Sequence, residues 1–436
     1  MLATIALVAA ACATDSAPAE PVTFFGKVTS AITGRNALNY HKRNRVPKTT
    51  TTTTAAAAAT TTTSTTTAPE ATTTTVAPTP PPAVNGSRDL FTWPFATNSI
   101  WNMPIGSGAR LVPAGLTVPG TVQNDQVRII RSSNSDPYRT IYNTVNYFGG
   151  GRCNSREATG LSVRVPDSLY IGDARPGYTP NSIVTLVDMD GRKIRSLGAV
   201  ARCLRDANGR EPGQAGYGAL PIDYNLYAVP ADDVADGQSL TGAGTYGAHF
   251  GSFLSGMGGH LRPGELTGSA PIRHALAINL WGKANLYYDR GLSPASGQLR
   301  GAGYRWPALQ ADSYAGQSDG YHGSNPATVM GALLTLPAGV TAESLGITSA
   351  VGRKLFDAFR DYGAYVVDDS YWDSVDIGMD DVAMAEFQSA TGREFGSGPE
   401  RSEVQKIMAA LHVVDNNGPS SIGGGGTPRA PLAPPA

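Results

Sequence analysis

Residues 245–281 read TYGAHFGSFLSGMGGHLRPGELTGSAPIRHALAINLW and hold His249, His260 and His274, half of the six histidines of the chain. Glycine and other small residues separate these three histidines. Glycine lets a ligand or another main chain approach closely, and a run so rich in glycine makes a poor apolar core. We therefore expect the polar side chains of this stretch to face a cleft or one another.

The last part of this stretch, residues 271–280, alternates in the way expected of a β-strand. Successive side chains of a strand point to opposite faces of the sheet. This alternation puts His274 on one face with leucine and isoleucine, and Arg273 on the other face among alanines. We expect His274 at the edge of a core and Arg273 on an open face that a ligand can reach.

The composition of the whole chain favours a mainly β fold. The chain has 436 residues with a formal net charge of −1, so no basic field indicates nucleic acid as a partner. It contains 51 glycines and 31 prolines, and only 16% of its residues are charged, which is typical of many turns and little helix. We predict a β-sandwich or jelly-roll-like domain with a few peripheral helices near the C-terminus.

Several local patterns support this fold. Residues 182–197 read as a hairpin, because two apolar runs flank Asp190-Gly191, a pair that type I′ turns prefer. One segment, 350–363, carries its apolar side chains at helical spacing and ends at a glycine, which predicts a helix. Further strands are expected at 140–148, 220–229 and 364–369, and further helices at 384–392 and 402–414.

The N-terminal part differs in composition from the rest. Residues 1–13, MLATIALVAAACA, resemble a signal peptide; the alternative is a lipoprotein signal with lipidation of Cys12. Residues 14–48 form an N-terminal segment, 49–84 a Thr/Ala/Pro-rich disordered linker or stalk, and 85–436 the globular β-rich domain. We therefore expect an extracytoplasmic protein, secreted or at the cell surface and in the lipoprotein case tethered to a membrane.

The two cysteines beyond the signal region are Cys153 and Cys203. In an exported protein they predict one disulfide; two buried thiols are the alternative. Neither cysteine has a second thiol or a histidine at metal-ligand spacing. No metal-ligand set is predicted and the cofactor is left unknown, although His249 or His260 with Glu265 would be able to ligate a metal.

Several standard catalytic signatures are absent from the sequence. There is no G-x-S-x-G, no H-E-x-x-H, no P-loop and no dinucleotide fingerprint after a strand. This argues against an ordinary serine hydrolase, a zinc protease of the H-E-x-x-H type and a nucleotide-dependent enzyme.

Carboxylates are the first candidates for chemistry. A glycosidase places two carboxyl groups across the bond that it breaks, and Glu265 with Asp369 or Asp223 would supply such a pair. In the strand 364–369, alternation puts Asp369 on the face of Tyr365 and Asp368 on the other face. The alternatives are an ion pair for Glu265 and a solvated loop for the aspartates that follow the strand.

Histidine and arginine complete the predicted site. His249 is assigned as a base or as an orienting group, and Arg273 as a clamp for a carboxylate or hydroxyl group, as a polysaccharide lyase requires. The predicted catalytic set is Glu265, His249, Arg273 and Asp369, and the predicted substrate-binding set is Asp223, His274, Asp368 and Trp281. The alternative for each histidine is a structural role.

An aromatic cluster opens the globular domain, in residues 88–106. It contains Trp93, Phe95, Ile100 and Trp101 on a loop-like background. Aromatic side chains stack on sugar rings, but they also cap cores, and we favour a core cap here.

The chain resembles an uncharacterised family of large secreted proteins from actinobacteria and environmental bacteria. The phrases that carry the resemblance are GELTGSAPIRHAL, DYGAYVVDD and SIGGGGTPRAPLAP, and it covers about residues 88–436. No activity is established for that family, so no catalytic residue is carried over. The resemblance implies a bacterial source and an extracytoplasmic setting.

Together these patterns predict an exported protein that acts on an extracellular polysaccharide, as a glycoside hydrolase or a polysaccharide lyase. The alternative is a non-catalytic module that binds a glycan or the cell wall. Glycine-rich loops with carboxylate, imidazole and guanidinium groups favour the enzyme. The binding module would use the same aromatics and polar loops but tolerate loss of the carboxylates, so product formation discriminates between the two.

Overall fold

The computed structural model of the protein describes residues 88–144, 151–154, 157–167, 169–174, 180–188, 193–202, 208, 210, 215, 226–230, 238–292 and 300–436. The chain divides into two units, Met1–Pro47 and Lys48–Ala436, and all the described residues lie in the second. The predicted signal peptide, N-terminal segment and stalk lie outside the described residues, so export remains a prediction.

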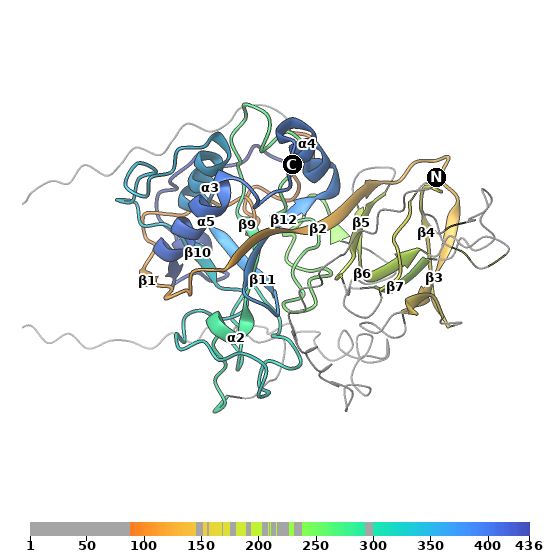
Figure 1. Ribbon diagram of the computed structural model, residues 1–436, viewed down its shortest axis with the longest axis horizontal. Helices are drawn as coiled ribbons and strands as arrows, with labels where there is room; N and C mark the ends of the chain where they lie inside the picture. Colours follow the sequence, from red (N-terminus) through yellow and green to blue (C-terminus); the bar gives the residue numbers. More distant parts are fainter. Residues whose placement is uncertain are drawn as a thin grey trace, which may run out of the picture. The chain divides into compact units, whose positions relative to one another are not determined.

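The described strands form one large mixed sheet, shown in Figure 1, with the order β1-β13-β10-β11-β9-β12-β2-β5-β6-β7-β3-β4 and with β8 paired to β6. The strands are β1 (Leu111–Pro113), β2 (Thr121–Arg131), β3 (Tyr138–Asn143), β4 (Ala158–Arg164), β5 (Ile183–Val187), β6 (Lys193–Arg202), β7 (Leu226–Pro230), β8 (Gln238–Ser239), β9 (Leu276–Leu280), β10 (Leu333–Thr335), β11 (Ala364–Asp369), β12 (Ser374–Asp380) and β13 (His412–Val414). The prediction of a mainly β fold is confirmed. A sandwich or jelly roll is not, because these strands are joined as one continuous hydrogen-bonded sheet.

The long strand β2 joins the part of the sheet that ends at β12 to the part that begins at β5 (Figure 1). Its residues 121–127 pair in parallel with β12, and residues 127–131 pair in parallel with β5. The expected hairpin of residues 182–197 is present as the antiparallel pair β5 and β6, while its turn at Asp190-Gly191 lies outside the described residues.

The helices lie mainly in the C-terminal part of the chain, as predicted. They are α2 (Gly282–Asn285), α3 (Ala350–Asp361), α4 (Asp381–Thr391) and α5 (Pro399–Ala410), with short 3-10 turns η1 (Arg152–Asn154) and η2 (Ile422–Gly424). The apolar side of α3 is buried, and Gly363 follows it with a φ of 79°, a conformation that favours glycine.

The predicted helix 402–414 is wrong at its end. The helix α5 stops at Ala410, and residues 412–414 form β13 between β1 and β10. The two valines of β13 are β-branched and fully buried, so pairing with two strands is preferred to another helical turn.

Two hydrophobic cores lie on opposite faces of β9. Leu276, Ile278 and Leu280 pack into the core that also contains α3 and α5. Ala275 and Ala277 pack into the second core, which contains Trp101 and Tyr365. The predicted alternation therefore holds from Leu276 onward.

The predicted strand at 271–280 is too long at its N-terminal end. Residues 271–275 lie outside β9, and the Ala275 N–H donates to the carbonyl of Trp101 at 2.7 Å instead of to a neighbouring strand. The alternation therefore does not apply to Arg273 and His274.

Cys153 is buried beside Ala201. Cys203 lies outside the described residues, so the disulfide remains a prediction. Within the described part of the chain, no helix is both long and apolar enough to cross a membrane.

Candidate functional site

A row of polar side chains crosses the sheet on four adjacent strands. Asp368 of β11 and Asp376 of β12 both pair with Asn279 of β9, and Asp125 of β2 pairs with Gly378, two residues after Asp376. Residues paired across neighbouring strands share a face of the sheet. The row therefore lies on one face, that of the second core.

A β-bulge in β11 sets which aspartate joins this row. The pairing shifts between Val366 and Asp368, so that Asp368 pairs with Asn279 and Asp369 with Leu280. A bulge adds one residue to one strand and changes the alternation beyond it. Asp368 therefore lies on the face of Tyr365, and the predicted placement of Asp369 on that face is wrong.

The glycine-rich stretch covers the row, and its glycines allow the approach. A Cβ on Gly251 would overlap Asp368 Oδ1, and the Gly251 main chain hydrogen-bonds to that carboxylate. A Cβ on Gly378 would overlap the His260 ring. Both contacts need a residue without a side chain. Gly251 belongs to the glycine-rich stretch and confirms the expectation of close approach there, whereas Gly378 belongs to β12.

His249 and His260 meet above the row. Their Nε2 atoms are 3.2 Å apart, their ring centroids are 5.1 Å apart, and their planes differ by 6°. His249 Nδ1 lies 3.9 Å from Asp368 Oδ2. Burial lowers the pKa of His249 to about 4, although Asp125 opposes the shift, and burial also lowers the pKa of His260. Both imidazoles are therefore neutral at pH 7.

Several buried atoms of this group have no hydrogen-bond partner among the described residues. They are Asp125 Oδ2, His249 Nδ1 and Asn279 Oδ1, whereas the His260 ring also hydrogen-bonds to the main chain of Met257. Buried polar atoms are nearly always hydrogen-bonded, so three such atoms in one place point to a bound group. Atoms of Asp125, His249 and His260 that are able to ligate a metal all lie within 4.8 Å of one another.

A second cluster lies beside the first, at the end of β11. Oxygens of Asp312, Asp368 and Asp369 all lie within 4.8 Å of one another, a spacing that would also admit a cation. The Tyr314 hydroxyl donates to Asp369 Oδ2, and the Tyr321 hydroxyl donates to Asp312 Oδ2. Each tyrosine therefore fixes the orientation of one carboxyl group.

Burial and mutual repulsion raise the pKa of these carboxyl groups. For Asp312, burial is the larger cause, followed by the charges of Asp369 and Asp368. Burial also raises the pKa of Asp369, against the opposing effect of hydrogen bonds from Tyr314 and the Tyr371 main chain. Carboxyl groups that repel one another retain a proton to higher pH than an isolated group does.

Exposed aromatic side chains border this second cluster. Tyr371 and Trp372 are 56% and 55% exposed, and the Tyr371 ring lies 5.8 Å from that of Tyr314. Tyr371 has a φ of 58°, which is strained for a residue with a side chain. Such strain concentrates at functional sites, which supports a functional role for the loop that contains Tyr371.

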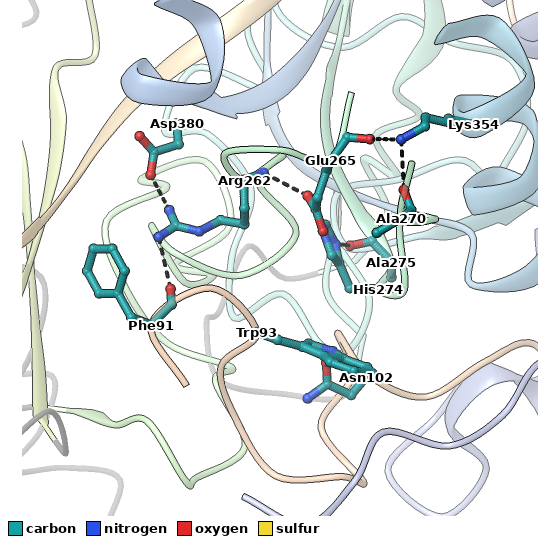
Figure 2. A network of polar contacts seen from close by, with 10 residues as sticks. All are labelled: Phe91, Trp93, Asn102, Arg262, Glu265, Ala270, His274, Ala275, Lys354 and Asp380. Carbon is teal, nitrogen blue, oxygen red and sulfur yellow. Dashed lines mark hydrogen bonds and ion pairs between the residues drawn. The ribbon is translucent and has the colours of Figure 1, made fainter. Parts of the chain in front are cut away.

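Glu265 lies in a different network, shown in Figure 2. Its Oε2 accepts the main-chain N–H of Arg262 at 2.7 Å and lies 3.1 Å from His274 Nε2. Its main-chain oxygen accepts from Lys354 Nζ at 2.5 Å. The hollow beside this network, which His274 and Trp93 help to line, has room for no more than about one water molecule. A sugar ring therefore does not fit there.

This network makes a pH-dependent contribution to stability. Burial would lower the pKa of His274, but the Glu265 carboxylate outweighs it and raises the pKa above 6.5. A raised histidine pKa stabilises the fold below the unfolded value and loses this effect as pH rises through the folded value. Glu265→Gln should therefore lower the free energy of unfolding more at about pH 5.5 than at about pH 9 in urea titrations.

The same substitution in a protein that lacks His274 checks this prediction. In a His274→Gln protein, the Glu265→Gln substitution should have the same effect at both pH values, because the titrating partner is gone. An equal loss at both pH values in the otherwise native protein would contradict the assignment.

The structure brings together only part of the predicted site. His249, Asp368 and Asp369 lie in the two adjoining clusters, whereas Glu265 and His274 pair with each other elsewhere. The predicted pairing of Glu265 with Asp369 is not seen among the contacts of the described residues.

The other predicted residues lie apart from the clusters or cannot be placed. Arg273 is exposed, as expected, with its guanidinium 5.9 Å from the Trp93 ring centroid. Trp281 is half-buried and precedes α2. Asp223 lies outside the described residues.

Sequence reasoning missed Asp125, Asn279 and Asp312. Asp376 was considered only among the aspartates after the strand 364–369, with a solvated loop as the alternative, whereas it is buried in β12. Asp125 lies in the strand-like run TVQNDQV, and Asp312 opens the aromatic loop DSYAGQSDGY. A polar residue inside a strand pattern and an aspartate near two tyrosines were the available signals.

Comparison of the chain with protein-family models, with curated proteins and with solved structures found no match in any of the three.

Proposed function

We propose that this protein is exported and acts on an extracellular polysaccharide, with Asp312 and Asp369 as the carboxyl pair that breaks the glycosidic bond. The observation that carries the proposal is the cluster of Asp312, Asp368 and Asp369, next to the exposed rings of Tyr371 and Trp372. Aromatic faces stack on sugar rings, and paired carboxyl groups supply an acid and a base or nucleophile.

The geometry suits a retaining glycosidase better than an inverting one. One carboxylate oxygen of each aspartate lies within 4.8 Å of the others, which is closer than the ~6.5–9.5 Å separation of the carboxyl groups in inverting enzymes. Burial and the neighbouring carboxylates raise the pKa of Asp312, which suits it to donate a proton. Asp369, which is half-buried and held by Tyr314, would then attack the sugar.

The setting of the protein belongs to the same proposal. The signal-like residues 1–13, with or without lipidation of Cys12, would export the chain, and residues 49–84 would hold the domain away from the surface. The resemblance to secreted bacterial proteins and the β-sandwich or jelly-roll-like arrangement are likewise hypotheses. The partner would be a polysaccharide or the cell wall, and no nucleic acid is expected.

Product formation from a panel of neutral and uronic-acid polysaccharides tests the proposal. The full chain should release new reducing ends. Asp369→Asn should lower turnover by at least the ~10²–10⁴ that is typical of an acid or base group, because the amide is a poor nucleophile. The matched control is Asp373→Asn, an exposed aspartate of the same loop, which should leave turnover unchanged.

The same assay separates the alternatives. Unsaturated uronic products would indicate elimination instead of hydrolysis. Retention of a polysaccharide on an affinity gel without any shortening would indicate the non-catalytic binding module, which the exposed Tyr371 and Trp372 also suit. Loss of turnover in a well-folded Glu265→Gln variant would show that Glu265 contributes to catalysis.

A further inference from the structure

We propose that Asp125, His249 and His260 bind one divalent transition-metal ion, between β2 and the glycine-rich stretch that covers the sheet. Two imidazoles and one carboxylate form a set of nitrogen and oxygen ligands that suits ions such as Zn²⁺, Mn²⁺ or Fe²⁺. This site does not depend on the proposed function, because a bound ion is measured without any substrate.

The separation of the two imidazoles fits a shared ion. Two nitrogens that each lie about 2.0–2.1 Å from one metal, at an angle of about 100–110°, are about 3.1–3.4 Å apart. The Nε2 atoms of His249 and His260 are 3.2 Å apart. One carboxylate oxygen of Asp125 lies within 4.8 Å of one ring nitrogen of each histidine, so a shift of the Asp125 side chain toward the imidazoles would let all three residues share one ion.

The unpartnered atoms support the same conclusion independently. His249 is fully buried, yet its Nδ1 atom has no hydrogen-bond partner among the described residues. Asp125 Oδ2 is also buried without a hydrogen-bond partner among the described residues. Leaving such atoms buried and unpaired is unfavourable, and coordination of a cation would satisfy the carboxylate directly.

The residues around the three ligands complete the arrangement. His249 Nδ1 lies 3.9 Å from Asp368 Oδ2, and Asn279 hydrogen-bonds to Asp125. Metal-bound histidines commonly turn their second nitrogen toward a carboxylate, and bound carboxylates are commonly hydrogen-bonded. Asp368 and Asn279 would thus be positioning residues for the ligands.

The local charge balance also favours a cation. Asp125, Asp368 and Asp376 lie together on one face of the sheet, and across the described ranges no lysine or arginine forms an ion pair with any of them. The nearby Arg262 is paired with Asp380. Buried carboxyl groups are normally paired with a cation, coordinate a metal or keep a proton, and a bound ion would supply the counter-charge here.

The competing interpretation is a hydrogen bond between two neutral imidazoles. One Nε2 would carry a proton and donate it to the other, and no ion would be needed. The two interpretations differ in a measurable quantity, the amount of metal that the protein holds at equilibrium.

The experiment uses the full chain without an affinity tag. The protein is stripped with a chelator, equilibrated separately with Zn²⁺, Co²⁺, Mn²⁺ or Ca²⁺, and analysed for bound metal and for Tm. We expect one transition-metal ion per chain, a higher Tm with that ion than without it, and no comparable effect of Ca²⁺. Bound Co²⁺ should also give a visible spectrum typical of nitrogen and oxygen ligands.

Variants locate the ion. Asp125→Asn and His249→Ala should each weaken binding at least tenfold, whereas His322→Ala, which removes an exposed histidine, should bind as the native chain does. If a ligand variant fails to fold, the metal content and the Tm of the native chain still decide. A native chain that holds no stoichiometric metal, or binding that survives both ligand substitutions, overturns the proposal.

Discussion

Asp380→Ala is expected to lower the free energy of unfolding by about 3–5 kcal/mol, because it leaves the guanidinium of Arg262 buried without its counter-charge. The two side chains form an ion pair in which each is only 2% exposed. Arg262 would keep a 2.9 Å hydrogen bond to the carbonyl of Phe91 and its position 5.0 Å from the Phe91 ring centroid (Figure 2). The charges of Glu265, Asp89 and Asp381 also act on Arg262, but among the described residues none of them forms an ion pair with it.

The pair itself is not expected to be a large net stabiliser. Burial raises the pKa of Asp380 to about 6 even though the Arg262 charge opposes the shift. The expected loss therefore arises mainly from the charge left behind. Asp380 Oδ1 also accepts the Val382 N–H at the start of α4, and the loss of this cap adds about 1 kcal/mol.

Urea unfolding of the native chain and the variants measures this effect. The matched control is Glu343→Ala, which breaks the exposed pair with Arg353 and should change stability far less than Asp380→Ala does. Replacing both Arg262 and Asp380 with apolar residues should be less harmful than Asp380→Ala alone. A loss from Asp380→Ala no larger than that of the control would contradict the assignment.

Trp101→Ala is expected to destabilise the fold by about 3–5 kcal/mol, the range for removing a large aromatic side chain from a core. Trp101 is 1% exposed, and its ring meets Tyr365 edge-on at 5.5 Å. Its Nε1–H donates to the carbonyl of Gly244 at 2.6 Å. The substitution would leave a cavity and also an unpaired carbonyl.

The surroundings of Trp101 limit how far this cavity can collapse. Gly258 and Gly259 lie directly against the ring, and a Cβ on either would overlap it. Main chain held by hydrogen bonds moves less easily than a flexible side chain, so the loss should fall in the upper half of the range.

A second tryptophan provides the control for this prediction. Trp372→Ala removes the same side chain from a position that is 55% exposed and should change stability by less than about 0.5 kcal/mol. Thermal and urea unfolding of both variants gives the comparison. Similar losses for the two substitutions would show that Trp101 does not have the core role assigned to it.

The sequence predicted local structure well wherever a short-range pattern was strong. The helix at 350–363 is confirmed by α3 and by Gly363 after it, and the hairpin at 182–197 by β5 and β6. The prediction that the aromatic cluster of residues 88–106 caps a core is confirmed for Trp101. These features depend on residues a few positions apart, and the helical and strand periodicities describe such distances directly.

The errors occurred where distant partners changed the local pattern. The alternation around Asp368 was wrong because pairing with β9 introduces a bulge, and the end of α5 was wrong because residues 412–414 pair with two other strands. A single strand or helix pattern contains no information about such partners.

The sequence by itself determined that the chain is rich in β-structure, that its helices lie near the C-terminus, and that the glycine-rich stretch allows close main-chain approach. Only the tertiary structure decided which polar groups meet. It placed Asp125, His249 and Asp368 together and paired Glu265 with His274 elsewhere. The physical reason is that strand order and register bring residues more than a hundred positions apart onto one face of the sheet, whereas side-chain periodicity acts only along one strand or helix.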